Sequence, residues 1–165
     1  MKKVVVFGGS GFLGSYVADE LTYRNYQVVI ADINPAKFKQ NDQQFVQCDI
    51  LQPESIEKVI EGAAIIYNFA GLADIDESIN LPHETMQQNV MGNINILEAC
   101  QKQNIDRYIY ASSAYAFSTK GSFYGISKLT SEKVVEEYFT RFDLPYSIIR
   151  YGSLYGERAD HHNGV

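Results

Sequence analysis

Residues 4–14 read Val-Val-Val-Phe-Gly-Gly-Ser-Gly-Phe-Leu-Gly, an apolar run that passes directly into three glycines spaced three residues apart. These glycines are Gly8, Gly11 and Gly14, and a helical pattern continues from them to about Arg24. A strand, a glycine turn and a helix in this order are typical of a phosphate-binding corner, because glycines permit a tight turn, close approach to a pyrophosphate and close helix packing. The helix N-terminus adds free N–H groups and a positive dipole end. The spacing alone also fits an ordinary tight turn.

Short apolar runs alternate with helical patterns along the whole chain. The runs, rich in β-branched and aromatic residues, are 4–7, 28–31, 45–47, 65–69, 108–111 and 146–150. Between them apolar residues recur at helical spacing, as Val90, Ile94 and Leu97 do. Alternating strands and helices predict a parallel sheet covered on both faces. The fold class is therefore α/β, a doubly wound Rossmann sheet in three layers.

Turn-forming residues mark the predicted ends of the helices. Residues that tolerate a left-handed conformation follow four of the helical patterns, namely Asn25, Gly62, Asn104 and Asp143. Pro53 and Pro82 stand where a helix would begin, as first-turn prolines do. The same punctuation predicts two long helices, over about 82–103 and over 122–142.

An acidic residue in the right place strengthens the dinucleotide interpretation. Asp32 ends the second predicted strand, somewhat less than 20 residues after Gly14. A carboxylate there accepts hydrogen bonds from a ribose diol and repels a 2′-phosphate, and no arginine follows it, so NAD is favoured over NADP. Asp49, at the end of the third strand, fits either a contact with the adenine edge or a solvated strand end.

Composition excludes several classes of protein. The 165 residues carry a formal net charge of −6 and are 45% hydrophobic, which suits one globular domain. No apolar stretch is long enough for a membrane span or a signal peptide, so a cytoplasmic protein is expected. No basic cluster points to nucleic acid. Cys48 and Cys100 read as buried free thiols, and the pair His161-His162 lacks a third ligand, so no metal is expected.

A second group of residues carries catalytic chemistry. Ser112-Ser113 closes the fifth predicted strand, and Tyr124 lies four residues before Lys128 at the start of the last long helix. That spacing places both side chains on one helix face. A neighbouring ammonium lowers the pKa of a tyrosine toward neutral pH, and the Ser113 hydroxyl can hold a reacting oxygen. The pair Tyr124 and Lys128 also fits an exposed helix face, but its place after a nucleotide-binding corner favours catalysis.

In order along the chain, these motifs resemble the extended short-chain dehydrogenase/reductase family, and within it the NAD-dependent epimerase/dehydratase group of nucleotide-sugar enzymes. The resemblance covers nearly the whole chain. It rests on the residues already quoted and on further stretches: Asn68-Phe69-Ala70-Gly71, Glu77-Ser78, Pro82, Asn89-Val90, Gly92 and Arg150-Tyr151-Gly152-Ser153-Leu154-Tyr155-Gly156.

The resemblance implies a role for each matching residue. The cofactor would be bound by Gly8, Gly11, Phe12, Leu13, Gly14, Asp32, Ile33, Asp49, Ile50, Phe69, Ala70, Gly71, Leu72 and Asn89, together with Tyr124 and Lys128. Phe12 and Leu13 would lie at the pyrophosphate, and Asn89 would face the nicotinamide end. Tyr124 would act as general acid and base, Lys128 would bind the nicotinamide ribose, and Ser113 would contact the reacting oxygen.

The chain also departs from the family pattern. Ala114-Tyr115 stands where the sugar dehydratases carry an acidic pair, so dehydration is disfavoured, and Ser153 replaces a usual asparagine. Family members continue beyond Gly156 into a substrate-binding region, so residues 1–165 are expected to be the NAD-binding domain of a longer protein, with the substrate domain missing.

The expected function is that of an NAD-dependent nucleotide-sugar epimerase or oxidoreductase. An NAD-binding module without turnover and a keto-sugar reductase are the alternatives. The resemblance further implies a homodimer built on the two long helices. The sequence does not identify the sugar.

Overall fold

The computed structural model describes residues 1–159, so the pair His161-His162 lies outside the described residues. Six parallel strands form one sheet in the order β3-β2-β1-β4-β5-β6. The strands are β1 (Lys3–Phe7), β2 (Gln27–Asp32), β3 (Gln44–Gln47), β4 (Ile65–Asn68), β5 (Arg107–Ser113) and β6 (Tyr146–Tyr151). The helices are α1 (Phe12–Tyr23), α2 (Pro53–Ile60), α3 (Ile75–Asn80), α4 (Pro82–Met86), α5 (Gly92–Gln101) and α6 (Ser122–Phe142). The doubly wound Rossmann topology is thus confirmed.

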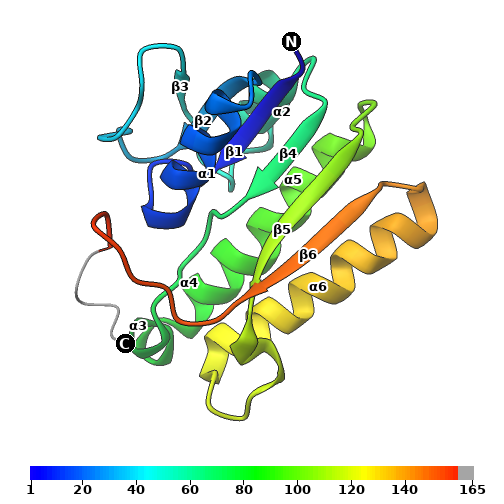
Figure 1. Ribbon diagram of the computed structural model, residues 1–165. Coiled ribbons are helices and arrows are strands. Elements are labelled where there is room, and N and C mark those ends of the chain that lie inside the picture. Colours follow the sequence, from blue (N-terminus) through cyan, green and yellow to red (C-terminus); the bar gives the residue numbers. More distant parts are fainter. Residues whose placement is uncertain (160–165) are drawn as a thin grey trace.

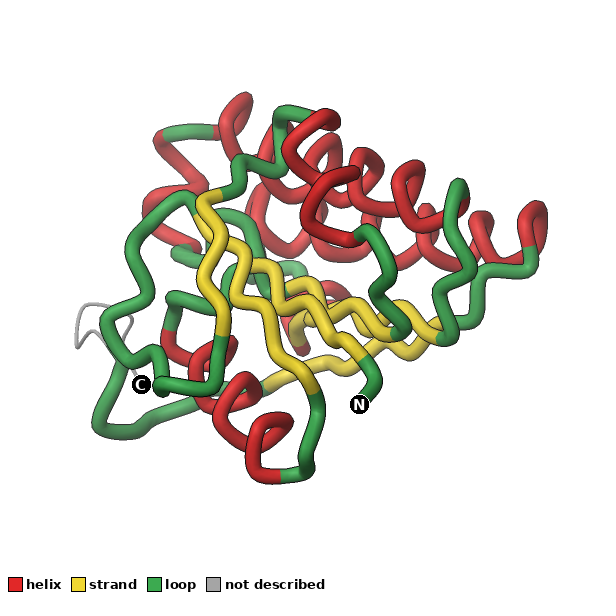
Figure 2. Tube along the Cα trace, turned by 90° about the horizontal axis from the view of Figure 1, so that it is seen from above, coloured by secondary structure: helices red, strands yellow, loops and turns green. Residues whose placement is uncertain are grey.

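Two apolar clusters, one on each face of the sheet, hold the layers together. The larger one packs α2, α5 and α6 against the sheet through Ile56, Ile96, Leu97 and Val135. The smaller one packs α1 against β1 and β2 through Ala18 and Leu21. Figure 1 shows the sheet with α5 and α6 along one side, and Figure 2, seen from above, shows helices on both faces of the strands.

The two faces are not covered equally, which differs from the expected coverage. The strand residues Val4, Val5, Val6 and Phe7 of β1 are fully buried. On the α1 side, however, Tyr67 is only partly buried, and Ile149 of the edge strand β6 is 40% exposed. The reason is that α1 spans only the half of the sheet around β1 and β2. The second layer is therefore complete over one half of the sheet.

The predicted helix ends are mostly confirmed. Asn25, Gly62 and Asp143 adopt positive φ angles of 63°, 70° and 53°. Asn104 also follows a helix, α5, but its φ is not positive. After α5 the chain turns instead through hydrogen bonds from Gln103 N–H to the Cys100 carbonyl and from Ile105 N–H to the Gln103 carbonyl.

The long helix predicted over 82–103 is interrupted. A π-helical turn, Gln87–Met91, separates α4 from α5, and Asn89 lies within it. Such turns recur at functional sites because they reorient one or two side chains. The short helix α3 is capped by Asp74, whose Oδ1 accepts the Glu77 N–H at 2.9 Å. Both prolines begin helices, as predicted.

Candidate active site at the carboxyl ends of the strands

The glycine turn after β1 is shaped by close contacts that leave no room for side chains. A Cβ on Gly14 would lie 2.3 Å from the Gly8 carbonyl oxygen, and a Cβ on Gly8 would lie 2.6 Å from the backbone nitrogen of Ala70. Gly8 also has a φ of +73°, which favours glycine. Gly11 is different, since its Cβ would meet only the Gly8 oxygen at 3.3 Å. Gly8 and Gly14 are therefore required by packing, whereas Gly11 leaves open space above the turn.

That open space faces the start of α1. The helix begins after Gly11 without a side-chain cap and with no acidic residue in its first turn. Its first N–H groups are therefore available to an anion. Asp32 lies beside the same turn, where its Oδ2 accepts the Ser10 N–H at 3.0 Å and its Oδ1 accepts the Asn34 N–H at 2.9 Å. The carboxylate is thus fixed at the end of β2, where a ribose contact was predicted.

The residues after β2 and β3 that were predicted to bind the cofactor divide into two kinds. Ile33 is 55% exposed, and the Asp49 carboxylate accepts the nearby Leu51 N–H at 2.9 Å. Ile50, in contrast, is buried, and its side chain fills the space beside Gly92 on α5. Its carbonyl accepts a hydrogen bond from Asn95 at 2.9 Å. Ile33 and Asp49 are accessible to a ligand, whereas the Ile50 side chain belongs to the core.

The segment that follows β4 is held by Asn89. The Asn89 side-chain oxygen accepts the Leu72 N–H at 2.7 Å, and its Nδ2 donates to the Leu72 carbonyl at 2.9 Å and to Ser127 Oγ at 2.8 Å. Gly71 has a φ of +137° and lies against the same amide. Because every N–H of this amide bonds within the protein, Asn89 braces the predicted cofactor wall and does not present a free amide to it.

The structure brings Ser113, Tyr124 and Lys128 together. Ser113 is the last residue of β5, and the other two lie in the first turns of α6. The Ser113 side chain lies close enough to Tyr124 to lower the pKa of the tyrosine. The Lys128 ammonium is buried, lies 5.7 Å from the centre of the Tyr124 ring and donates to the Ala111 carbonyl at 2.9 Å.

The electrostatics of this cluster differ from the expectation. Burial raises the pKa of Tyr124, and the neighbouring Ser113 side chain only partly opposes this effect. Burial likewise lowers the pKa of Lys128 to about 8, while the nearby Glu132 acts in the opposite sense. Lys128 lies over the face of the tyrosine ring, and the pKa of the hydroxyl is raised despite the ammonium nearby. The tyrosine is therefore a proton donor here.

Sequence reasoning missed one charged group, Glu132, which lies one helical turn beyond Lys128. Its side chain is 1% exposed, accepts a hydrogen bond from Ser112 Oγ and pairs with Arg150 of β6. Burial acts to raise its pKa, but Arg150 and Ser112 outweigh burial and lower it. The Arg150 guanidinium also stacks 3.9 Å from the centre of the Phe117 ring. The signal in the sequence was the continued spacing of four after Tyr124 and Lys128.

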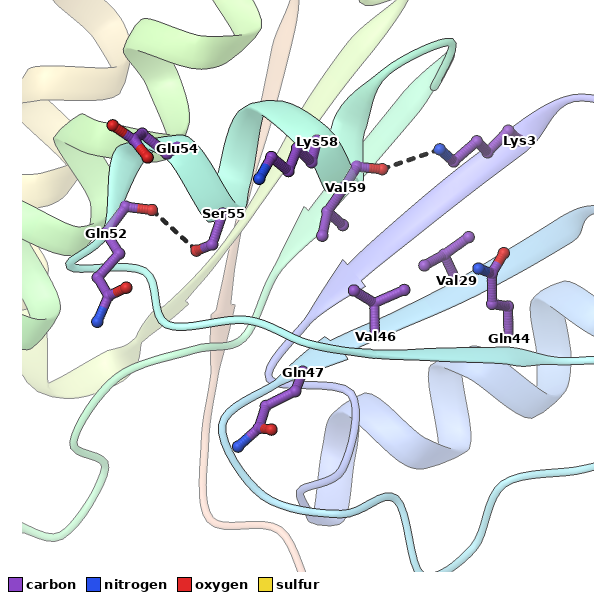
Figure 3. A pocket seen from close by; sticks show the side chains of 10 residues that line it. All are labelled: Lys3, Val29, Gln44, Val46, Gln47, Gln52, Glu54, Ser55, Lys58 and Val59. Atoms are coloured by element: carbon purple, nitrogen blue, oxygen red, sulfur yellow. Dashed lines mark hydrogen bonds between the residues drawn. The ribbon is translucent and has the colours of Figure 1, made fainter.

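A pocket of about 390 Å³ lies elsewhere, between α2 and the edge of the sheet at β3 (Figure 3). None of its lining residues belongs to the predicted site; they are Lys3, Val29, Gln44, Val46, Gln47, Gln52, Glu54, Ser55, Lys58 and Val59. The Lys3 ammonium is already bound by the carbonyls of Val59 and Glu61.

Other expectations about composition can be compared with the structure. Cys48 and Cys100 are buried free thiols, as predicted. Within residues 1–159, no group of three or more metal-ligating side chains is found. No helix of this part of the chain combines the length and apolarity that crossing a bilayer requires.

Comparison with known proteins agrees with this geometry. The sequence model of the NAD-dependent epimerase/dehydratase family matches residues 4–165. The chain belongs to this family. Among curated sequences, it is 31% identical over 175 residues to a putative UDP-glucose 4-epimerase of Methanocaldococcus jannaschii, an alignment that covers 95% of this chain and 57% of the relative.

Solved structures of the family have the same fold. The UDP-glucose 4-epimerase of Thermus thermophilus in complex with NAD superposes with a TM-score of 0.90 at 25% identity, covering 98% of this chain and 58% of that one. The UDP-glucose 4-epimerase of Thermotoga maritima, determined with UDP-glucose, gives a TM-score of 0.88 at 25% identity, covering 96% and 58%. This family member thus spans somewhat more than half the length of these relatives, and NAD is the cofactor of its family.

Proposed function

We propose that residues 1–165 form the NAD-binding domain of an NAD-dependent nucleotide-sugar epimerase, and that its sugar site requires further residues. The lengths of the relatives support this division, because the aligned part is 57% of the Methanocaldococcus jannaschii protein. The substrate class follows from relatives that are UDP-glucose 4-epimerases. A nucleotide sugar is therefore the proposed partner, and pairing of two copies through the long helices remains part of the proposal.

The residues of the crevice fit a dinucleotide. Gly11 leaves open space over an uncapped helix start, which suits a pyrophosphate. The Asp32 carboxylate, fixed by Ser10 and Asn34, retains lone pairs for a ribose diol. Tyr124 and Lys128 would lie toward the nicotinamide end, beside the segment braced by Asn89. When bound, NAD would supply a hydride acceptor that can also return the hydride.

The chain's own residues would handle the proton and the orientation of the sugar. Tyr124 Oη would take the proton of a sugar hydroxyl as the carbon beneath it is oxidised, and would return that proton on reduction. Ser113 would hold the same oxygen through its hydroxyl. Lys128 would move from the Ala111 carbonyl toward the cofactor ribose, where its charge favours the phenolate of Tyr124. Reduction from the opposite face of the sugar would give the epimer.

The observation that carries this proposal is the meeting of Ser113, Tyr124 and Lys128 at the carboxyl end of β5. Ligands of doubly wound sheets bind at this edge, near the point where the strand order reverses. Here β1 and β4 flank that point, and the glycine turn and the segment after β4 contact each other across it.

Conversion of a nucleotide sugar by the full-length protein tests the proposal. The protein, loaded with NAD, is incubated with UDP-glucose and UDP-galactose, and the products are followed by NMR for the wild type and Tyr124→Phe. We expect interconversion by the wild type and a loss of about 10²- to 10⁴-fold in the variant. Equal rates in both would remove Tyr124 from the reaction. Binding of NAD without conversion of UDP-, GDP- or dTDP-sugars would instead indicate a binding module.

A further inference from the structure

The segment that follows β6 returns to the glycine turn. Figure 1 shows it running from the edge of the sheet back toward α1. There Gly156 lies on the ring of Phe12, so that a Cβ on this glycine would be 3.2 Å from Phe12 Cε2. A hydrogen bond from Ala159 N–H to the Gly156 carbonyl at 3.1 Å closes a turn at the same point. Gly156 and the turn that follows it therefore lie against the start of α1.

Arg158 fastens this segment to α1. Its Nη2 donates to Asp19 Oδ2 at 2.7 Å and its Nη1 donates to Ser15 Oγ at 3.2 Å. Its guanidinium lies 4.3 Å from the centre of the Tyr16 ring and 4.8 Å from that of Phe38. The side chains of Arg158 and Asp19 are only 21% and 18% exposed. A sheltered ion pair between two aromatic faces is a specific contact, unlike the exposed pairs elsewhere on this surface.

The same contact includes the loop between β2 and β3. Phe38 belongs to this loop, and the buried Gln43 at its end donates from Nε2 to Asp19 Oδ1 at 2.9 Å and to Thr22 Oγ1 at 3.0 Å. Asp19 thus accepts bonds from two segments at once, Arg158 on one oxygen and Gln43 on the other. One arginine joins three parts of the chain: α1, the loop 33–43 and the segment 152–159.

These three parts border the crevice in which the cofactor is proposed to bind. Ser15 Oγ accepts a hydrogen bond from Arg158 and itself donates to the Phe12 carbonyl at 2.9 Å. Phe12 is therefore held from two sides, by Gly156 on its ring and by Ser15 on its backbone. The loop 33–43 follows Asp32 directly, so its position determines which groups surround the ribose.

We propose that Arg158 is a positioning residue of the cofactor site, which clasps the segment 152–159 and the loop 33–43 onto α1 and thereby slows the release of NAD. This inference rests on the proposed function. Arg158 itself does not touch the dinucleotide in this account; it acts through Phe12 and the loop after Asp32. Its removal should loosen two walls of the crevice while leaving the sheet intact.

The test is NAD binding by the full-length protein, freed of cofactor, measured by calorimetry and by the rate of NAD release. Arg158→Ala should weaken binding about tenfold, mostly through faster release. Arg158→Lys keeps the charge, but a lysine lacks the planar guanidinium that bonds both Ser15 and Asp19 while lying between two aromatic rings. This variant should therefore recover only part of the lost NAD affinity. Asp19→Asn, which keeps the shape of the clasp, should show an intermediate effect and serves if Arg158→Ala folds poorly.

Arg141→Ala is the matched control. Arg141 pairs with Glu137 at 2.6 Å in the exposed last turn of α6. It should leave NAD binding unchanged. Unchanged affinity and release in Arg158→Ala, or full recovery in Arg158→Lys, would overturn the positioning role alone. A wild-type protein that bound no NAD would overturn the proposed function, and the role of Arg158 with it.

Discussion

Arg150 and Glu132 form a two-pronged ion pair that joins β6 to α6: Arg150 Nε donates to Oε1 at 2.9 Å and Nη2 donates to Oε2 at 2.8 Å. The two partners are not equally sheltered, since their side chains are 47% and 1% exposed. Ser112, the neighbour of Ser113, donates to the same carboxylate. The pair therefore fixes the strand end on which the proposed catalytic serine lies.

Because Glu132 is buried and Arg150 is half-exposed, substituting one partner or the other should lower the free energy of unfolding by different amounts. Glu132→Gln leaves a half-exposed arginine that water can solvate, so we expect a loss of about 1–3 kcal/mol of unfolding free energy. Arg150→Ala leaves a buried carboxylate without its partner and should cost more. Urea unfolding of both variants measures the order. A larger loss in Glu132→Gln than in Arg150→Ala would contradict this account of the pair.

The pH dependence of stability follows from the same pair. The pKa of Glu132 is lower in the folded chain than in the unfolded chain, where a glutamate titrates at about 4.3. The ionised carboxylate therefore contributes stability above that pH, and the contribution is lost as the pH falls through the folded pKa. Between about pH 5 and pH 3 the wild type should lose stability faster than Glu132→Gln. Parallel acid unfolding curves would show that the carboxylate contributes nothing.

The charged form of Lys128, unlike that of Glu132, should destabilise the fold. Its pKa is lowered to about 8 by burial, so the folded chain releases this proton before the unfolded chain does. The burial of a charged lysine destabilises the fold below about pH 8, and this cost is relieved as the pH rises toward 10. Lys128→Met removes the charge, so the stability of the wild type relative to this variant should rise by about 2 kcal/mol between about pH 7 and about pH 9.5. A difference that does not change with pH would place the ammonium in water.

Gly14 and Gly11 of the turn should respond differently to substitution by alanine. Gly14→Ala forces a methyl group to within 2.3 Å of the Gly8 oxygen, so it should cost about 1–3 kcal/mol of stability. Gly11 has an ordinary φ of −77° and an open surface, so Gly11→Ala should cost less than about 1 kcal/mol while still weakening NAD binding. Thermal unfolding and calorimetry on both variants separate the effects. Normal NAD affinity in Gly11→Ala would mean that no pyrophosphate approaches this position.

Asp32 should determine the choice between NAD and NADP. Asp32→Asn keeps one oxygen for a backbone N–H but removes the charge that repels a 2′-phosphate, so we expect the affinity for NADP relative to NAD to rise about tenfold or more. Titration of wild type and variant with both dinucleotides measures the ratio. An unchanged ratio would show that the carboxylate does not face the ribose.

The sequence was sufficient where a local pattern has a local cause. All six strands were predicted. For the central strands the cause is burial from both sides, which the continuous apolar run Val4–Phe7 reflects. The last long helix was also predicted with its bounds, Ser122–Phe142. The fixed spacing of the glycines predicted the phosphate-binding turn, and the order of motifs along the chain indicated the family. The meeting of Tyr124 with Ser113 followed from the topology.

Contacts between distant segments could not be predicted in this way. The pairs Arg150 with Glu132 and Arg158 with Asp19 join residues that no periodicity connects. The π-helical turn at Asn89 was also not predicted, because one extra residue in a helical turn hardly changes the spacing of apolar residues. The raised pKa of Tyr124 depends on burial, which only the packed structure reveals.

The most direct test of the central claim is the near-ultraviolet absorbance of the NAD-loaded full-length protein after mixing with a nucleotide sugar. The account predicts that UDP-glucose produces the band of reduced nicotinamide, and that Tyr124→Phe, which binds the same cofactor, produces it far more slowly. Full occupancy by NAD with no reduced band and no epimer from any UDP-, GDP- or dTDP-sugar would contradict the account.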